Sequence, residues 1–222
     1  MESQNPTEIT MQIRSINIAI PKEVEYQGKK ILTGIFKKPV NHPVIATKLG
    51  LDGDGQADLE NHGGFDKAIY IYTLENYRYW EKTLGRSAFT FGQFGENLTV
   101  EGMPDERIHI GDIFEIGSTR MQVTQPRVPC YKLGIKMEMP KFLKLFMPSG
   151  RVGFYLRVLN GGAINQCDTI QLVKQDQQKL SIREAMLALI DNPHRQEIVK
   201  KALAIKALSV AWRTDLERGL TN

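Results

Sequence analysis

With 222 residues and 41% apolar content, the chain is long enough for one large domain, or for one domain with a small appendage. Its formal net charge of +4 is too small to indicate a nucleic-acid-binding surface, although it suits a local pocket for an anionic ligand. The sequence has no run of about 18 apolar residues, as a membrane-spanning helix requires, and its polar first residues, MESQNPTEITMQ, do not resemble a signal peptide.

From about residue 12 to residue 173, the sequence predicts many short strands separated by Gly, Pro or Asp turns. Ile16, Ile18 and Ile20 alternate with smaller or polar residues, as in a half-buried strand. Further β-rich runs are ILTGIF, VIATKL, AIYIY, DIFEIG, GFYLRVL and DTIQLV. Strands at this spacing, mostly without intervening helices, favour a mixed-direction, barrel-like sheet over a parallel α/β fold.

One helix is predicted inside this strand-rich region, over the residues TLENYRYWEKTLG. Thr73 is its candidate N-cap and Gly85 its candidate stop. Leu74, Tyr77 and Leu84 lie near one face of this helix.

Beyond residue 173 the pattern becomes helical to the end of the chain. Ser181 and Glu184 form a capping-box pattern, and Asn192-Pro193 is typical of a cap followed by a first helical residue. Ser209 is the candidate cap of a third helix.

These patterns predict two domains, a strand-rich core over 12–173 and a small three-helix domain over 174–222. A helix-turn-helix is one interpretation of the helical part. Its basic residues are interleaved with acidic ones and form no stripe, so we favour a docking or dimerisation appendage and expect no nucleic-acid partner.

The glycine-rich stretch 50–70, GLDGDGQADLENHGGFDKAIY, is a candidate binding loop. Counting Asp52 as the first ligand of an EF-hand puts Ala57 where glycine is needed and Gly63 where glutamate is needed, which excludes that site. No Gly-Lys-Ser/Thr P-loop and no G-x-S-x-G nucleophile motif occurs. Two interpretations remain. One is a turn whose backbone N–H groups approach an anion, with Lys67 to balance charge. The other is a structural turn whose aspartates satisfy local backbone donors.

The stretch PRVPC, residues 126–130, places a cysteine in a stiff and positive setting. In a polyproline-like segment, Arg127 and Cys130 fall on the same edge. If the chain continues as a strand, Cys130 and Lys132 also share a face. Nearby cations favour the thiolate, which is both a nucleophile and a soft metal ligand. A buried inert cysteine is the alternative, and that interpretation suits Cys167 well.

The cysteine count limits what this thiolate does. Two cysteines provide neither a disulfide framework nor a zinc pattern, and too few ligands for an iron–sulfur cluster. A chain without a disulfide framework is natural in a reducing compartment, so we expect a cytoplasmic protein. A weaker motif, FGENLTVEG, places Asn97 and Thr99 either in a pocket-lining loop or in an Asx-type turn.

Together, these segments resemble the MOSC family, named for the C-terminal domain of molybdenum cofactor sulfurase. The matching stretches are TGIFKKPV, LDGDGQADLENHGGFDKAIYIY, FGENLTVEG, IGDIFEIG, QPRVPCYKLG and GFYLRVLNGG, in the family's order over about residues 31 to 170. The last helices resemble the three-alpha appendage of the same proteins. The resemblance implies a mainly β, α+β fold with a MOSC β-barrel-like core and a small C-terminal three-helix domain.

The resemblance also implies a site for the pterin-based molybdenum cofactor. Cys130 matches the cysteine of the PR-x-PC motif, which implies that it is the protein's ligand to molybdenum. Asp54 or His62 are candidates for delivering protons during oxygen loss. The candidate cofactor-binding residues are Lys37, Asn61, Gly63, Gly64, Lys67, Asn97, Arg127 and Lys132.

The activity that the resemblance implies is reductive. The substrates are small N-hydroxylated compounds, such as hydroxylamines and hydroxylated purines like 6-N-hydroxylaminopurine, and detoxification of such bases is the implied role. Because no flavin or nicotinamide motif is visible, electrons have to come from a separate flavin- or haem-containing protein, for which the three-helix tail is a candidate dock. The alternative is a cofactor or sulfur carrier that uses a Cys130 persulfide without turnover.

Overall fold

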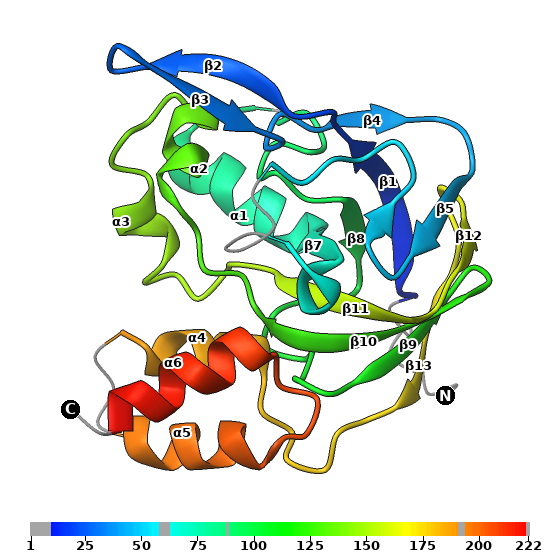
Figure 1. Cartoon of the computed structure of the whole chain (residues 1–222), viewed down its shortest axis with the longest axis vertical. Helices are drawn as coiled ribbons and strands as arrows, with labels where there is room; N and C mark the ends of the chain where they lie inside the picture. The colour runs from blue at the N-terminus through cyan, green and yellow to red at the C-terminus, as the bar shows by residue number, and fades with distance from the viewer. Residues whose placement is uncertain (1–9, 58–62, 88, 191–193, 221–222) are drawn as a thin grey trace, which may run out of the picture.

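A computed structural model describes residues 10–57, 63–87, 89–190 and 194–220. They form a strand-rich core followed by a group of helices (Figure 1). The strands are β1 (Gln12–Ile18), β2 (Lys22–Tyr26), β3 (Lys29–Thr33), β4 (Lys38–Val40), β5 (Val44–Thr47), β6 (Gly50–Leu51), β7 (Ile69–Thr73), β8 (Leu98–Glu101), β9 (Ile113–Ile116), β10 (Thr119–Pro126), β11 (Phe154–Asn160), β12 (Gly162–Ile164) and β13 (Ile170–Lys174). The helices are α1 (Leu74–Leu84), α2 (Tyr131–Lys136), α3 (Leu143–Phe146), α4 (Ile182–Ala188), α5 (Arg195–Ala204) and α6 (Val210–Leu220), with a 3₁₀ turn at Phe65–Lys67.

The main sheet has eight strands in the order β13-β9-β10-β11-β7-β8-β1-β4. Its neighbours are antiparallel except β7 and β8, which are parallel and are joined through α1. The sheet curves back on itself, so that the start of β13 meets the start of β1. The Ile170 N–H donates to the Met11 carbonyl at 2.8 Å, next to an isolated bridge between Gln12 and Thr169. It does not close into a barrel. The predicted mainly β, α+β class with a mixed-direction sheet is confirmed.

Two smaller sheets flank the main one. β2 and β3 form a hairpin of their own, and β12, β5 and β6 form a three-stranded sheet. The β-rich runs predicted at ILTGIF, VIATKL, AIYIY, DIFEIG, GFYLRVL and DTIQLV all contain strands.

Helix α1 begins and ends where the sequence predicts. The Thr73 hydroxyl accepts a hydrogen bond from Asn76 N, and Gly85 ends the helix with φ 61° in the left-handed region. Tyr77 and Trp80 lie on the buried face, and the Trp80 indole donates to the Tyr72 hydroxyl at 2.7 Å. A capped, amphipathic helix is thus fixed to β7 by polar as well as apolar contacts.

The chain beyond Cys130 is helical, so the condition under which Cys130 and Lys132 would share the face of a strand is not met. Cys130 itself is extended, with φ −115° and ψ 172°, and α2 starts at the next residue. Leu133 and Met137 are four residues apart and are both fully buried, which is the spacing of a helix. This short apolar periodicity is the signal that favours the helix.

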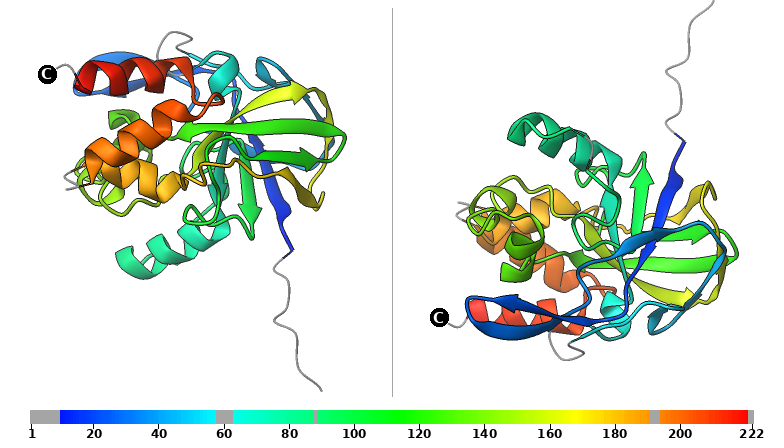
Figure 2. Two further views of the ribbon diagram at one scale, coloured as in Figure 1. Left: turned by 90° about the horizontal axis from the view of Figure 1, so that it is seen from below. Right: turned by 90° about the horizontal axis from the view of Figure 1, so that it is seen from above.

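The C-terminal helices α4, α5 and α6 lie together beside the sheet, apart from α1 (Figure 2). Ser181 accepts a hydrogen bond from Glu184 N, and Ser209 accepts one from Trp212 N, so both predicted caps are confirmed. The predicted cap at Asn192-Pro193 lies outside the described residues. No helix of the described chain is long and apolar enough to cross a membrane.

Backbone hydrogen bonds tie these helices to the core. Ser209 N donates to the Thr124 carbonyl of β10 at 3.2 Å, and Ile182 N donates to the Ile108 carbonyl at 2.9 Å. Val210 N, at the start of α6, donates to the Asp66 carboxylate at 3.0 Å. The helices and the sheet also share one hydrophobic cluster. A domain boundary between residues 173 and 174 therefore stays a prediction.

Candidate functional site

One pocket brings together side chains from segments that are far apart in the sequence. It contains about 660 Å³ of empty space, part of it open to solvent. Seven predicted site residues line it, namely Lys37, Asp54, Lys67, Asn97, Arg127, Cys130 and Lys132. The other lining residues are Thr33, Gly34, Ile35, Gly55, Gln56, Ala57, Tyr70, Gly95 and Tyr155.

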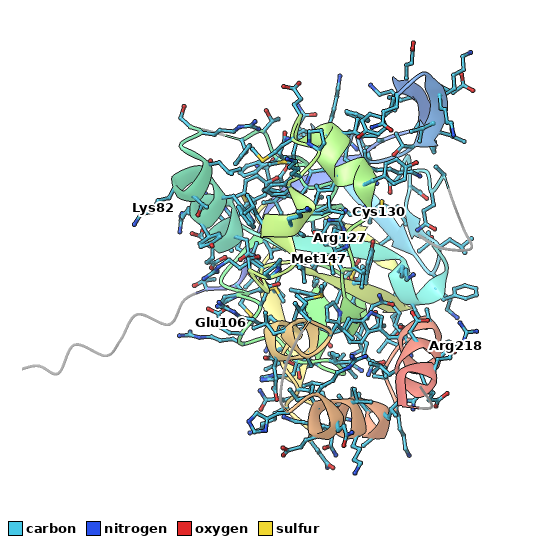
Figure 3. All side chains as sticks on the ribbon, turned by 90° about the vertical axis from the view of Figure 1, so that its left-hand side faces the viewer. Lys82, Glu106, Arg127, Cys130, Met147 and Arg218 are labelled. Carbon is cyan, nitrogen blue, oxygen red and sulfur yellow. The ribbon has the colours of Figure 1, made fainter. Side chains whose placement is uncertain are left out.

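Cys130 and Arg127 reach this pocket from the loop between β10 and α2, and Figure 3 shows them close together. Cys130 is half-buried and is not part of a disulfide. Arg127 is only 6% exposed, and its backbone N–H donates to the Gly153 carbonyl at 3.1 Å. A largely buried guanidinium thus lies beside a thiol that is open to the pocket.

The Arg127 guanidinium lacks a hydrogen-bond partner that its position would normally require. Its Nη1 atom is buried and bonds to no acceptor in the part of the chain that the structure describes. Its ring contacts are with Tyr70, at 5.1 Å, and Phe146, at 5.8 Å. Burial alone lowers the pKa of Arg127, but the facing Tyr70, Tyr155 and Cys130 outweigh it and hold the pKa above its ordinary value. A charged, buried and unsatisfied donor fits a site for an anion.

Asp54 organises the opposite side of the pocket. Its Oδ1 atom accepts hydrogen bonds from Lys37 Nζ and, at 2.9 Å, from Ala19 N. Its Oδ2 atom accepts one from Asn97 Nδ2 at 2.8 Å. Burial is the main effect on Lys37 and lowers its pKa, although the ion pair with Asp54 opposes it. Accepting three donors is the contact pattern of a positioning residue, and proton delivery by Asp54 stays a prediction.

In the described part of the glycine-rich loop, one backbone N–H group is bonded within the protein. The Gly64 N–H donates to Gln56 Oε1 at 3.3 Å, and Gln56 Nε2 lies 3.4 Å from the Lys67 carbonyl. The Gly64 N–H, which was expected to bind a ligand, is therefore bonded to Gln56. Neither Gly63 nor Gly64 lines the pocket. Lys67 does line it. The predicted Asn61 and His62 lie outside the described residues.

Two tyrosines line the pocket that the sequence did not single out. Tyr70 of β7 and Tyr155 of β11 are paired across the sheet, with ring centroids 5.3 Å apart. Both belong to runs that predict strands, but alternation alone does not tell which face of a strand meets a pocket. Lys132 completes the rim, with its Nζ atom 3.3 Å from the Leu32 carbonyl of the β2–β3 hairpin.

Below the pocket, Asp105 holds the turn that supports Arg127. Its Oδ1 atom accepts a hydrogen bond from Gly153 N at 2.7 Å, and its Oδ2 atom accepts one from the Asn76 amide. Gly153 has φ 71°, and a Cβ atom there would lie 2.3 Å from the Ile71 carbonyl oxygen. Only glycine fits this turn, which presents its carbonyl to Arg127 N.

Asp105 also predicts a dependence of stability on pH. Burial raises its pKa from 3.8 to about 6, although its hydrogen bonds oppose the shift. A carboxyl with a raised pKa stabilises the fold fully below the unfolded value, and that contribution is lost as the pH rises through the folded value. We expect the free energy of unfolding to fall between about pH 4 and pH 6, with this group contributing at most about 1.4 kcal/mol per pH unit.

Urea denaturation across this pH range measures the slope. The variant Asp105→Asn removes the titrating group and is expected to flatten the profile relative to the wild type. A variant whose free energy of unfolding falls as steeply as that of the wild type would show that another group is responsible.

Metal ligands do not cluster elsewhere among the described residues. No group of three or more His, Cys, Asp or Glu side chains that could hold a metal ion is found there.

The chain is similar to one protein family and to several individual proteins. A family model described as MOSC domain matches residues 58–171. YflK of Bacillus subtilis (strain 168) is 38% identical over 201 residues, which are 90% of each chain. The crystal structure of YiiM from Geobacillus stearothermophilus is similar with a TM-score of 0.79 and 36% identity, over 94% of this chain and 98% of that one. A protein named Reductase from Gibberella moniliformis is 35% identical over 158 residues, which are 70% of this chain but 28% of that protein.

Proposed function

Because this chain belongs to the MOSC domain family, we propose that it is a molybdenum-cofactor-dependent reductase that removes oxygen from N-hydroxylated compounds. The observation that carries the proposal is the pocket in which the Cys130 thiol lies beside the unsatisfied Nη1 atom of Arg127. Together they offer one soft metal ligand and one strong anion donor.

The residues of this pocket fit the cofactor's chemistry. The cofactor carries a phosphate and a dithiolene, and it supplies a metal able to take up oxygen and exchange electrons. A lone cysteine gives one ligand, which suits a metal whose other sulfur ligands belong to an organic group. Cys130 would hold the metal, while Arg127, Lys67 and Lys132 would balance the negative charge. Lys37 is held by Asp54 and would contribute from a fixed position.

The relative named Reductase supports the reductive direction of the proposal. This chain matches only 28% of that protein, so the relative contains a large additional region. We propose that this chain receives its electrons from a separate flavin- or haem-containing protein. The helices α4 to α6 are the surface on which we expect that protein to dock.

The test is to express the protein in cells able and unable to make molybdopterin, and to measure molybdenum and pterin in the purified samples. We expect about one metal per chain from the first cells and none from the second, together with reduction of 6-N-hydroxylaminopurine by the loaded protein when reductant is supplied. A protein without molybdenum from both kinds of cell would overturn the proposal.

The second candidate is a carrier, which the partial exposure of Cys130 favours. A persulfide on this cysteine adds about 32 Da, one sulfur atom, to the intact mass. An adduct of that size that is lost in Cys130→Ser, without turnover of N-hydroxylated substrate even with reductant, would favour the carrier.

A further inference from the structure

Two tyrosines that are paired across the sheet line the pocket, and their hydroxyl groups differ in their hydrogen bonds. Tyr70 is buried, and its O–H donates to the Val152 carbonyl at 2.8 Å. Tyr155 is half-buried and lines the same pocket. Its O–H donates to no acceptor within the described residues. The Tyr70 proton is therefore used inside the protein, whereas the Tyr155 proton has no acceptor among the described residues.

The Arg127 guanidinium interacts electrostatically with the Tyr155 hydroxyl. A guanidinium has N–H donors and no acceptor, so Arg127 cannot take up the O–H proton of Tyr155. The Tyr155 hydroxyl can therefore donate a hydrogen bond into the pocket that Cys130 and Arg127 also line.

We infer that Tyr155 binds the substrate by donating a hydrogen bond to the oxygen of its N–O group. This inference rests on the proposed function, and it assigns to that function a residue that selects the substrate. The N-hydroxylated compound carries the oxygen that Tyr155 recognises, and the reduced product lacks it. Tyr155 would therefore favour entry of the hydroxylated base and release of its parent base.

A binding experiment with two probes separates this role from a structural one. The loaded, oxidised protein is titrated without reductant with 6-N-hydroxylaminopurine and with adenine, and a dissociation constant is measured for each. For Tyr155→Phe, we expect binding of the hydroxylated probe to weaken roughly 3- to 10-fold, the effect of one hydrogen bond, and binding of adenine to stay unchanged.

Tyr70→Phe is the matched control. It removes a hydroxyl from the neighbouring ring, but one that is bonded to Val152, so it should affect both probes equally. Equal weakening of both probes in Tyr155→Phe would overturn the inference, and so would a wild type that does not prefer the hydroxylated probe. If the wild type contains molybdenum and reduces the probe while Tyr155→Phe binds as the wild type does, the proposed function stands and this inference fails. If the wild type contains no molybdenum, the proposed function fails instead.

Discussion

Replacing Cys130 with alanine is expected to strip molybdenum from the protein without unfolding it. Among the described residues that line the pocket, Cys130 provides the only sulfur, and losing it removes the proposed metal ligand. Even outer partners of metal ligands change metal affinity by about 10- to 100-fold when they are mutated, so the ligand itself should cost at least that much. Metal analysis of the purified variant, with turnover of 6-N-hydroxylaminopurine, measures the effect.

The fold should tolerate this change. The Cys130 side chain makes no capping hydrogen bond to α2, although its backbone begins that helix. We expect the melting temperature of the protein without cofactor to stay close to that of the wild type. Cys167→Ser is the matched control, because Cys167 lies outside the pocket. Cys167 is exposed, so the buried position that the sequence favoured for it is wrong. Wild-type molybdenum content in Cys130→Ala would show that the metal is held in another way.

Replacing Arg127 with methionine is expected to have opposite effects on stability and on cofactor binding. In the protein without cofactor, methionine removes a buried charge with an unsatisfied Nη1 atom while it keeps much of the apolar contact. Lost contacts to the Tyr70 and Phe146 rings partly offset this gain. The free energy of unfolding should therefore be unchanged or higher, by up to about 2 kcal/mol.

Cofactor binding should suffer in the same variant. A charge-assisted hydrogen bond contributes about 1.5–3 kcal/mol, so its loss should weaken binding roughly 10- to 100-fold. Urea denaturation of protein from cells that lack molybdopterin measures the stability, and molybdenum analysis of protein from competent cells measures the binding. Arg151→Met is the control, because Arg151 also packs on an aromatic ring, Tyr79 at 4.6 Å, but does not line the pocket. An Arg127→Met protein that is less stable than the wild type and keeps its molybdenum would contradict both expectations.

The local rules of helices and strands predicted much of this fold. Thr73, Ser181 and Ser209 act as caps because a side-chain oxygen before an amphipathic run satisfies the first free N–H groups. Such signals lie within a few residues of the structure that they specify. The short helix α2 was missed because two prolines just before it favour extended backbone, and only Leu133 and Met137 reveal the helical period.

The sequence predicted those candidate site residues whose chemistry follows from the type of side chain. Cys130 and Arg127 stand out because a thiol between prolines and cations is unusual, and the structure places them in one pocket with Lys37 and Lys67. Tyr155 was not predictable, because its orientation depends on the curvature of the sheet. The role of Gln56 was also hidden, because its bond to the Gly64 N–H depends on how the loop folds over β6.

The hydrogen bond from Val210 N to Asp66 couples the start of α6 to the pocket loop. Asp66 directly precedes the pocket-lining Lys67 and also pairs with Arg157 at 2.8 Å. A ligand that moves this loop therefore strains the first turn of the last helix. Thermodynamic linkage makes such coupling reciprocal. If a partner protein that binds α6 changes the affinity of the pocket for its ligand, then the ligand changes the affinity of α6 for the partner by the same factor. Comparing the partner's affinity for empty and loaded protein would read out this communication between two surfaces.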